Sequence, residues 1–318
     1  MNVIGINGFG RIGRCFTRIA LNDNSIEIAL INDLADISSL AHLLKYDSIH
    51  GTLNISFTIE GNTLHFENGK KIIFTQEKDP SQIPWGNYSV ETVVESTGMF
   101  LTRDSASKHL RNSVKRVILS APANDLDIQT VVMGVNDKDI NLSDTIFSNA
   151  SCTTNNAAPM IKVLKELVKI DVAYISTVHS YTSDQRLHDS PHKDLRRARA
   201  AANSIIPTST GAAKAITKIF PDLDGKITGG SVRVPVLDGS MTEMTIITKD
   251  EITVEQINTA MKNAALGSMK GILGYTKDPI VSVDVIGSSY SCLFDSELTL
   301  VFKNLIKVVG WYDNEAGY

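Results

Sequence analysis

Cysteine is scarce in this chain of 318 residues, and the three that occur, Cys15, Cys152 and Cys292, lie far apart. They form no C-x-x-C pair, which argues against a disulfide framework and a structural zinc site and favours a reducing compartment. No apolar run approaches the length of about 18 residues that spans a bilayer. The N-terminus also lacks the basic segment of a signal peptide. We therefore expect a cytoplasmic protein with no membrane partner and no metal site.

An excess of basic residues is also missing. The chain has 31 Lys and Arg against 35 Asp and Glu, a net charge of −4. A mildly acidic chain does not attract nucleic acid as a whole, so no nucleic-acid partner is expected. Hydrophobic residues make up 42%, which is enough for a folded core and excludes general disorder. The length predicts about two domains.

The first half of the sequence alternates strand-like and helix-like segments. Apolar runs at 3–6 and 26–31 predict buried strands, and the apolar residues from Ile12 to Ala20, including Phe16 and Ile19, recur at helical spacing. A β-α-β start indicates a parallel sheet with right-handed crossovers. Turn signals within 52–74 predict antiparallel hairpins beside it. Further strands are expected at 90–95, 114–119 and 131–135, and a helix at 35–44.

The second half has a different pattern. Long strand candidates at 172–180, 227–237 and 241–248 predict a large, mostly antiparallel sheet, covered by helices at 212–220 and 254–266. The fold class expected is therefore α/β, with an N-terminal doubly wound Rossmann-type domain followed by an α+β domain with a mixed sheet. We place the boundary at 151/152.

The glycine-rich segment Gly8-Phe9-Gly10-Arg11-Ile12-Gly13 follows the first strand and opens the first helix. This G-x-G-x-x-G pattern lets a pyrophosphate approach the N–H groups of a helix N-terminus. Asp33 lies 20 residues beyond Gly13, at the end of the second strand. A carboxylate there binds a ribose 2′-hydroxyl and repels a 2′-phosphate. Motif, spacing and context together predict an NAD site, whereas the motif alone would also suit a turn that only packs helix on strand.

Cys152 differs from the other two cysteines because it lies among hydroxyl residues at a predicted helix start. Met160, Val163 and Leu164 continue at helical spacing, and Pro159 predicts a kink or a short first segment. A thiol in the first turn has its pKa lowered by the helix dipole. We expect Cys152 to be a nucleophile, and Cys15 and Cys292 to be buried apolar residues.

A thiolate nucleophile usually needs a base beside it. His179, at the end of the predicted strand 172–180, is one candidate among seven histidines. Spacing alone does not choose between them. The other candidates are His42, His50, His65, His109, His188 and His192.

Five segments together resemble the phosphorylating glyceraldehyde-3-phosphate dehydrogenase family, and the resemblance extends from the first strand to the last residue. They are 7–14 (NGFGRIGR), 151–155 (SCTTN), 191–199 (PHKDLRRAR), 207–214 (PTSTGAAK) and 311–315 (WYDNE). The family oxidises glyceraldehyde 3-phosphate with NAD and inorganic phosphate to 1,3-bisphosphoglycerate. Its reaction passes through a cysteine thiohemiacetal and a thioester.

The resemblance assigns a role to each site residue. Cys152 would be the nucleophile, and His179 its base and oxyanion partner. Ser151, Thr153, Thr210 and Gly211 would bind the attacking inorganic phosphate, whereas Thr182 and Arg233, with Arg197 nearby, would hold the substrate phosphate. The cofactor contacts implied are Gly8, Phe9, Gly10, Arg11, Ile12, Asp33, Lys78, Ser120 and Asn314.

The family also implies a homotetramer, with the basic segment 193–199 as an interface loop beside the cofactor. In this view residues 1–151 form the NAD-binding domain, 152–313 form the catalytic domain, and 314–318 return to the first domain. The family normally continues past Tyr318 into a helix on the cofactor domain, and its loss would weaken stability and NAD binding.

The sequence departs from the family pattern at three further positions. Asn156 stands where a second cysteine is common, which removes a disulfide partner without touching catalysis. Ala316 replaces a bulky residue near the nicotinamide end. Ser190 replaces a larger apolar residue of NAD-specific members, which weakens the preference inferred from Asp33.

Two alternatives remain. Erythrose-4-phosphate dehydrogenase shares the fold, the cysteine and the histidine, but it hydrolyses its thioester and needs no inorganic phosphate. The segments 181–185 and 208–211 resemble the glyceraldehyde enzyme more closely. A binding or adhesion role for the fold is a different class, and an inert scaffold would be expected to lose Cys152 or His179.

Overall fold

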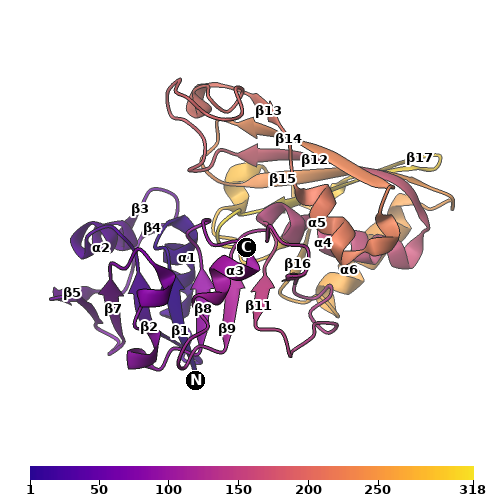
Figure 1. Cartoon of the computed structure of the whole chain (residues 1–318). Coiled ribbons are helices and arrows are strands. Elements are labelled where there is room, and N and C mark those ends of the chain that lie inside the picture. Colours follow the sequence, from indigo (N-terminus) through magenta and orange to yellow (C-terminus); the bar gives the residue numbers. More distant parts are fainter. The chain divides into compact units, whose positions relative to one another are not determined.

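The computed structural model describes all residues from 1 to 318, and the chain divides into two compact units (Figure 1). The first unit comprises 1–131 and 140–150, and the second comprises 132–139 and 151–318. This division differs from the boundary expected at 151/152, because Ser151 and the segments 132–139 and 314–318 lie in the second unit. The assignment of the units as NAD-binding and catalytic domains with the predicted boundaries stays a prediction.

The first unit is built on a nine-stranded sheet in the order β10-β11-β9-β8-β1-β2-β7-β6-β5. The strands from β10 to β7 pair in parallel, whereas β7, β6 and β5 pair antiparallel. The predicted parallel sheet and the hairpins within 52–74 are thus confirmed. The strand bounds are β1 Asn2–Asn7, β2 Ile26–Asn32, β5 Phe57–Glu60, β6 Thr63–Phe66, β7 Lys71–Thr75, β8 Thr92–Glu95, β9 Arg116–Leu119, β10 Gln129–Thr130 and β11 Ile146–Ser148.

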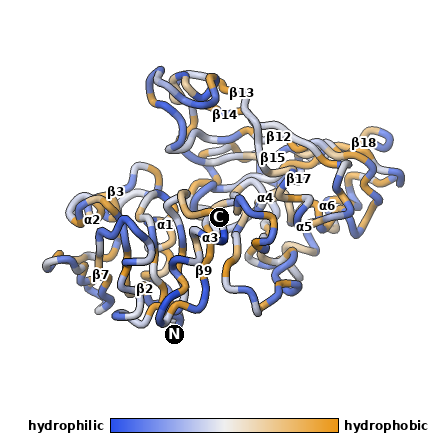
Figure 2. Tube along the Cα trace, in the orientation of Figure 1, coloured by the Kyte–Doolittle hydropathy of each residue, from blue (hydrophilic) through white to orange (hydrophobic).

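Both faces of this sheet are covered, as is typical of a parallel sheet. Neighbouring residues of β2 show this, because Leu30 and Ile31 enter different apolar clusters. Hydrophobic residues recur along the strands of this unit in the Cα trace (Figure 2). The smaller elements are α1 Arg11–Ala20, α2 Ile37–Lys45, α3 Arg103–Ser107, the short ladder β3 Tyr46–Asp47 with β4 Gly51–Thr52, and the 3-10 turns η1 Pro80–Gln82 and η2 Trp85–Tyr88.

Helix α1 forms where the apolar spacing predicts it, but it buries a different face. Ile19 is 54% exposed, whereas Gly13 and Thr17 are buried. The reason is the close approach of the helix to the turn before it. A Cβ on Gly13 would lie 2.4 Å from the carbonyl oxygen of Gly8. The helix therefore packs through its small residues.

The strand expected at 131–135 is wrong. The chain pairs only at β10 and then turns, with Gly134 at φ +73° and the Val132 amide donating to Asn136 Oδ1. The residues after Thr130 therefore leave the sheet. The predicted strand 227–237 is also three residues too long, because β14 ends at Val234.

The second unit is built on a seven-stranded sheet in the order β13-β14-β12-β15-β18-β17-β16. Four of its pairs are antiparallel and two are parallel, which confirms the predicted mixed, mostly antiparallel sheet. The strands after residue 266 were not predicted. The bounds are β12 Ile170–Ser180, β13 Ile206–Thr208, β14 Ile227–Val234, β15 Ser240–Thr248, β16 Leu273–Thr276, β17 Cys292–Phe302 and β18 Leu305–Tyr312.

Three helices lie on one face of this sheet (Figure 1): α4 Cys152–Leu167, α5 Ala212–Ile219 and α6 Val254–Leu266. Short 3-10 turns lie at η3 Ala201–Asn203, η4 Pro221–Leu223 and η5 Ser282–Val285. Helix α4 runs unbroken through Pro159, so the short first segment offered as one outcome does not occur. No helix combines the length and apolar character that a membrane crossing requires.

Candidate active site

Cys152 is the first residue of α4, at the helix end where backbone N–H groups have no intrahelical acceptor. Ser151 is the N-cap residue, and its Oγ accepts the Thr154 amide at 3.2 Å. The cap preference of serine explains why the helix begins at this point. Ala150 just before it has φ +59°, a left-handed conformation that costs energy in a residue with a Cβ. The chain thus makes a sharp turn into the helix and presents the thiol at its first position.

His179 is the histidine that meets this thiol. It lies near the end of β12, is 5% exposed, and places Nε2 3.4 Å from Cys152 Sγ. Its Nδ1 lies 2.7 Å from the carbonyl oxygen of Ser180. Nδ1 also lies 3.0 Å from Arg233 Nη1, which can only donate, but its shorter contact is to a carbonyl, which only accepts. We therefore assign the proton to Nδ1, which leaves the lone pair of Nε2 facing the thiol. Of the seven histidines, His179 is the one whose ring contacts the Cys152 thiol.

Burial sets the protonation of this pair. It raises the pKa of the Cys152 thiol to about 11, although the Arg233 charge and the Thr153 amide act in the opposite direction. This is the reverse of the lowering expected from the helix dipole alone. Burial also lowers the pKa of His179 to about 3, and the Arg233 charge lowers it further. Each group alone is neutral at pH 7, so charge arises by proton transfer within the pair.

Arg233 reaches the catalytic pair from the neighbouring strand. In the parallel register of β12 and β14 it lies opposite His179. Its Nη1 donates to the carbonyl oxygen of Ser180 at 3.0 Å and to Thr182 Oγ1 at 3.2 Å. Its Nε is buried and has no hydrogen-bond partner. Arg233 and Thr182 thus lie in contact, and one buried donor of Arg233 has no acceptor.

Arg197 lies close to Arg233, but its guanidinium is already paired with a carboxylate. Its Nη1 donates to Asp184 Oδ2 at 2.6 Å, and its Nε donates to Thr208 Oγ1 at 2.9 Å. Asp184 also accepts from Thr182 Oγ1. The role of Asp184 was not predicted from the sequence. An acidic residue two positions after the predicted phosphate ligand Thr182 was the signal that could have identified it.

The residues predicted to bind inorganic phosphate lie at the N-termini of two helices that pack together, α4 and α5. Thr153 is buried and its Oγ1 is 2.9 Å from Tyr312 Oη, a contact that the sequence did not indicate. Gly211 is the N-cap residue of α5 and has no side chain of its own to cap the helix. Thr210 Oγ1 accepts the Ala212 amide at 3.2 Å.

The predicted cofactor residues of the first unit surround the carboxyl end of β1. The strand order reverses at β1, and open α/β sheets bind ligands at such a switch point. Gly8 has φ +95°, and no side chain caps α1 at Gly10. Asp33 Oδ2 accepts the Phe9 amide at 2.7 Å, which fixes the glycine turn against the end of β2. Phe9 and Asp33 are thus held together at this end of the sheet.

The other predicted cofactor residues differ in their surroundings. Arg11 forms a two-point ion pair with Asp47 at 2.6 and 3.0 Å. Burial opposes ionisation of Asp47, but the Arg11 guanidinium outweighs it and holds the pKa of that carboxyl at about 2. Ser120 is tied to the sheet by its amide, which donates to the Glu95 carbonyl oxygen at 2.9 Å. Lys78 is exposed.

A buried polar network below the glycine turn was also missed. Glu95 accepts from Asn7 Nδ2 at 2.6 Å and from the Thr97 amide at 2.9 Å, and His109 Nε2 lies 3.0 Å from it. Trp85 Nε1 donates to His109 Nδ1 at 3.2 Å, so Nε2 carries the proton toward Glu95. Polar residues at the ends of buried strands were the signal that could have identified this network.

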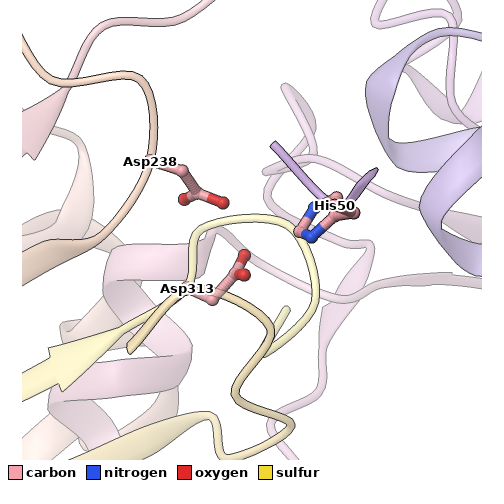
Figure 3. Close-up of side chains that lie close together, drawn as sticks. All are labelled: His50, Asp238 and Asp313. Carbon is pink, nitrogen blue, oxygen red and sulfur yellow. The ribbon is translucent and has the colours of Figure 1, made fainter. Parts of the chain in front are cut away.

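Two buried carboxyl groups of the second unit, Asp238 and Asp313, point toward one another (Figure 3). Asp313 accepts amide hydrogens from Gly287, Glu315 and Ala316, each at 2.7 Å. Burial raises the pKa of Asp238 to about 7, and the charge of the neighbouring Asp313 acts in the same direction.

Comparison with known proteins agrees with this geometry. The model of the glyceraldehyde 3-phosphate dehydrogenase NAD-binding domain matches residues 2–103, and that of the C-terminal domain of the same enzyme matches residues 151–314. Glyceraldehyde-3-phosphate dehydrogenase 1 of Bacillus cereus is 53% identical over 320 residues, covering 100% of this chain and 95% of the relative. The corresponding enzyme 1 of Bacillus subtilis is 51% identical over 317 residues, covering 99% and 94%.

We expect His179→Asn to slow alkylation of Cys152 by iodoacetamide at pH 7 at least tenfold. The neutral reagent reacts with the thiolate, which at this pH forms by transfer of the Sγ proton to Nε2. The measurement is the alkylation rate by mass spectrometry, with the surface variant His42→Asn as control. An unchanged rate in His179→Asn would show that the imidazole is not the proton acceptor.

We expect Asp238→Asn to change how stability depends on pH. Because the pKa of Asp238 is raised in the folded state, folding retains a proton that the unfolded chain releases above about pH 4. The stability contributed by this proton is present in acid and is lost as the pH rises toward and through neutrality. The melting temperature of the variant relative to wild type should therefore rise between pH 5 and pH 8. A difference that stays constant, as expected for the surface control Asp171→Asn, would contradict the assignment.

Proposed function

The chain belongs to the glyceraldehyde-3-phosphate dehydrogenase family and has its activity and NAD-binding domain, and we propose which residues hold each reactant. The observation that carries the proposal is the contact of 3.4 Å between Cys152 Sγ and His179 Nε2 at the start of α4. A thiol with a base and a helix N-terminus beside it is equipped to attack an aldehyde carbon. We propose D-glyceraldehyde 3-phosphate and inorganic phosphate as its substrates.

The glycine turn of the first unit fits a dinucleotide. A Cβ built on Gly10 would meet nothing within 4 Å, so the space beside the uncapped N-terminus of α1 is open. Asp33 accepts a hydrogen bond from the Phe9 amide of this turn. Its carboxylate can also accept hydrogen bonds from ribose hydroxyls, and it repels a 2′-phosphate. We assign NAD binding to Gly8, Phe9, Gly10, Arg11, Ile12, Asp33, Lys78 and Ser120 in the first unit and Asn314 in the second.

The catalytic pair performs the covalent steps. Sγ transfers its proton to Nε2 of His179 and bonds to the aldehyde carbon, which gives a thiohemiacetal on Cys152. The resulting oxyanion is stabilised by the imidazolium and by the N–H groups at the start of α4. NAD bound at the glycine turn would supply the acceptor for the hydride that leaves that carbon. Attack of phosphate on the remaining thioester breaks the C–S bond, releases the acyl phosphate and returns the thiolate to Cys152.

Two anion sites fit one phosphorylated substrate and one free phosphate. We assign the substrate phosphate to Thr182 and Arg233, with Arg197 nearby, because Arg233 has a buried donor without a partner. The attacking phosphate is assigned to the start of α4 and α5, where N–H groups and hydroxyls favour an anion. The residues of that second site are Ser151, Thr153, Thr210 and Gly211.

We propose that the chain forms a homotetramer in the cytoplasm. The face of the second sheet opposite its helices carries exposed apolar side chains, among them Val172, Tyr174 and Ile247, which are 49%, 47% and 39% exposed. Val172 and Ile247 are directly opposite in the register of β12 and β15, so they share one face. Contiguous exposed apolar area of this kind is typical of a subunit interface. Three free cysteines suit a reducing compartment.

We expect NADH formation from glyceraldehyde 3-phosphate to require inorganic phosphate and to fall at least about 1,000-fold in Cys152→Ser. The serine hydroxyl is a far weaker nucleophile than the thiolate. Initial rates are measured at 340 nm with and without phosphate, and with erythrose 4-phosphate as competing substrate. Slow turnover that does not depend on phosphate would support the four-carbon enzyme instead.

We expect Tyr174→Asp to convert the tetramer to smaller species, because it places a charge within an apolar interface. Size-exclusion chromatography with light scattering gives the mass of each species. Leu126→Asp, on an exposed residue of the first unit, is the matched control and should leave the mass unchanged. A wild-type chain that elutes as a monomer would overturn this assignment.

A further inference from the structure

Helix α4 begins at Cys152 and runs along strand β18 of the second sheet. One turn after Cys152, Asn156 Nδ2 donates to the carbonyl oxygen of Trp311 at 3.0 Å. One turn further, Met160 lies against Gly310, because a Cβ built on Gly310 would be 2.7 Å from Met160 Cε. Successive turns of α4 therefore lie over residues that come progressively earlier in the strand.

The strands beneath α4 place polar side chains in two rows. His179 and Ser240 belong to the first row, at the level of the reacting thiol. Thr177 and Thr242 are direct partners in the register of β12 and β15. Each lies two residues from its first-row neighbour, so it points to the same face of the sheet, about 6.6 Å further along. Helix α4 rises about 6 Å over the four residues from the thiol to Asn156, which therefore lies at the level of the second row.

The two rows differ in their hydrogen bonds. In the first row, Ser240 Oγ donates to Asn314 Oδ1 at 3.0 Å. In the second row, Thr177 Oγ1, Thr242 Oγ1 and Asn156 Oδ1 belong to residues that are at most 1% exposed, and none of the three atoms has a hydrogen-bond partner in the protein. A buried polar atom without a partner costs free energy. Three such atoms at one level of the core therefore indicate a ligand that hydrogen-bonds to all of them.

The three groups define the chemistry of that ligand. The carbonyl of Trp311 only accepts, so the Asn156 atom that faces it is Nδ2, and Oδ1 remains an acceptor. The hydroxyls of Thr177 and Thr242 can each donate and accept. The ligand must therefore be small and must donate at least one hydrogen bond. All three groups are neutral and the charge of Arg233 on the neighbouring strand β14 is positive, so a buried cation would have no counter-charge here.

We propose that Asn156, Thr177 and Thr242 bind a single water molecule between α4 and the sheet, one level beneath the catalytic pair. Buried waters typically make about three hydrogen bonds to polar groups that lack protein partners, and three such groups meet here. The water donates to Asn156 Oδ1 and exchanges hydrogen bonds with the two hydroxyls. It thereby joins α4 to β12 and β15 directly below Cys152 and His179. The inference is independent of the proposed function, because it concerns only how α4 is held on the sheet.

The double variant Thr177→Val with Thr242→Val tests the site through the sign of its effect on stability. Valine resembles threonine in shape and suits a strand, so the variant exchanges two hydroxyls for methyl groups. If the hydroxyls had no partner, this exchange would remove two unsatisfied groups and raise the melting temperature. Because the water and Asn156 Oδ1 lose their partners instead, we expect the melting temperature to fall by about 3 °C in scanning calorimetry. The control Thr228→Val, on an exposed residue of β14, should shift it by less than about 1 °C.

A crystal structure of the full chain observes the ligand directly. In the wild type we expect a water peak within about 3.2 Å of Asn156 Oδ1, Thr177 Oγ1 and Thr242 Oγ1. The peak should persist in Thr242→Ser, which keeps the hydroxyl, and should be lost in the double variant. Two results would overturn the proposal: a wild-type structure in which the three atoms bond only to protein groups, and a double variant that melts at the same or a higher temperature. Shorter contacts that occur only in the presence of sodium would identify a cation and overturn the choice of water.

Discussion

The cost of ionising a half-buried thiol and a buried imidazole is the constraint on which the second unit depends. Neither Cys152 nor His179 is charged alone at neutral pH, because burial raises the pKa of the thiol and lowers that of the imidazole. Proton transfer between atoms 3.4 Å apart creates both charges together, so each is stabilised by the other. Arg233 favours the thiolate and disfavours the imidazolium. The arrangement thus keeps the nucleophile neutral until the two groups act as one.

The sheet of the second unit explains how distant residues reach this pair. Four neighbouring strands, β14, β12, β15 and β18, form this part of the sheet. At one common end of these strands lie His179, Arg233, Ser240 and Tyr312. The hydrogen-bonded register of the strands fixes where these side chains lie relative to one another more precisely than loops would. Helix α4 adds the thiol from the covered face.

Much of this could be predicted from the sequence, and the failures have physical causes. The glycine turn with Asp33, and the hydroxyl residues that cap α4 before Cys152, are local signals, and both were read correctly as structure. The choice of His179 needed the family resemblance, since seven histidines have no local feature that separates them. The direction of the thiol pKa shift was wrong because burial is a tertiary property that outweighs the helix dipole. The hydrogen bonds of Asn314 likewise join residues distant in sequence.

The carboxylate of Asp184 gives the predicted substrate-phosphate site its own counter-ion. Arg197 is neutralised by it at 2.6 Å, and Thr182 is bound to the same group. An anion that enters the proposed phosphate site would therefore compete with a carboxylate that is already in place. A dianion interacts with two guanidinium groups more strongly than a monoanion such as chloride. Under the proposed assignment, the charge of Asp184 thus favours dianions over monoanions.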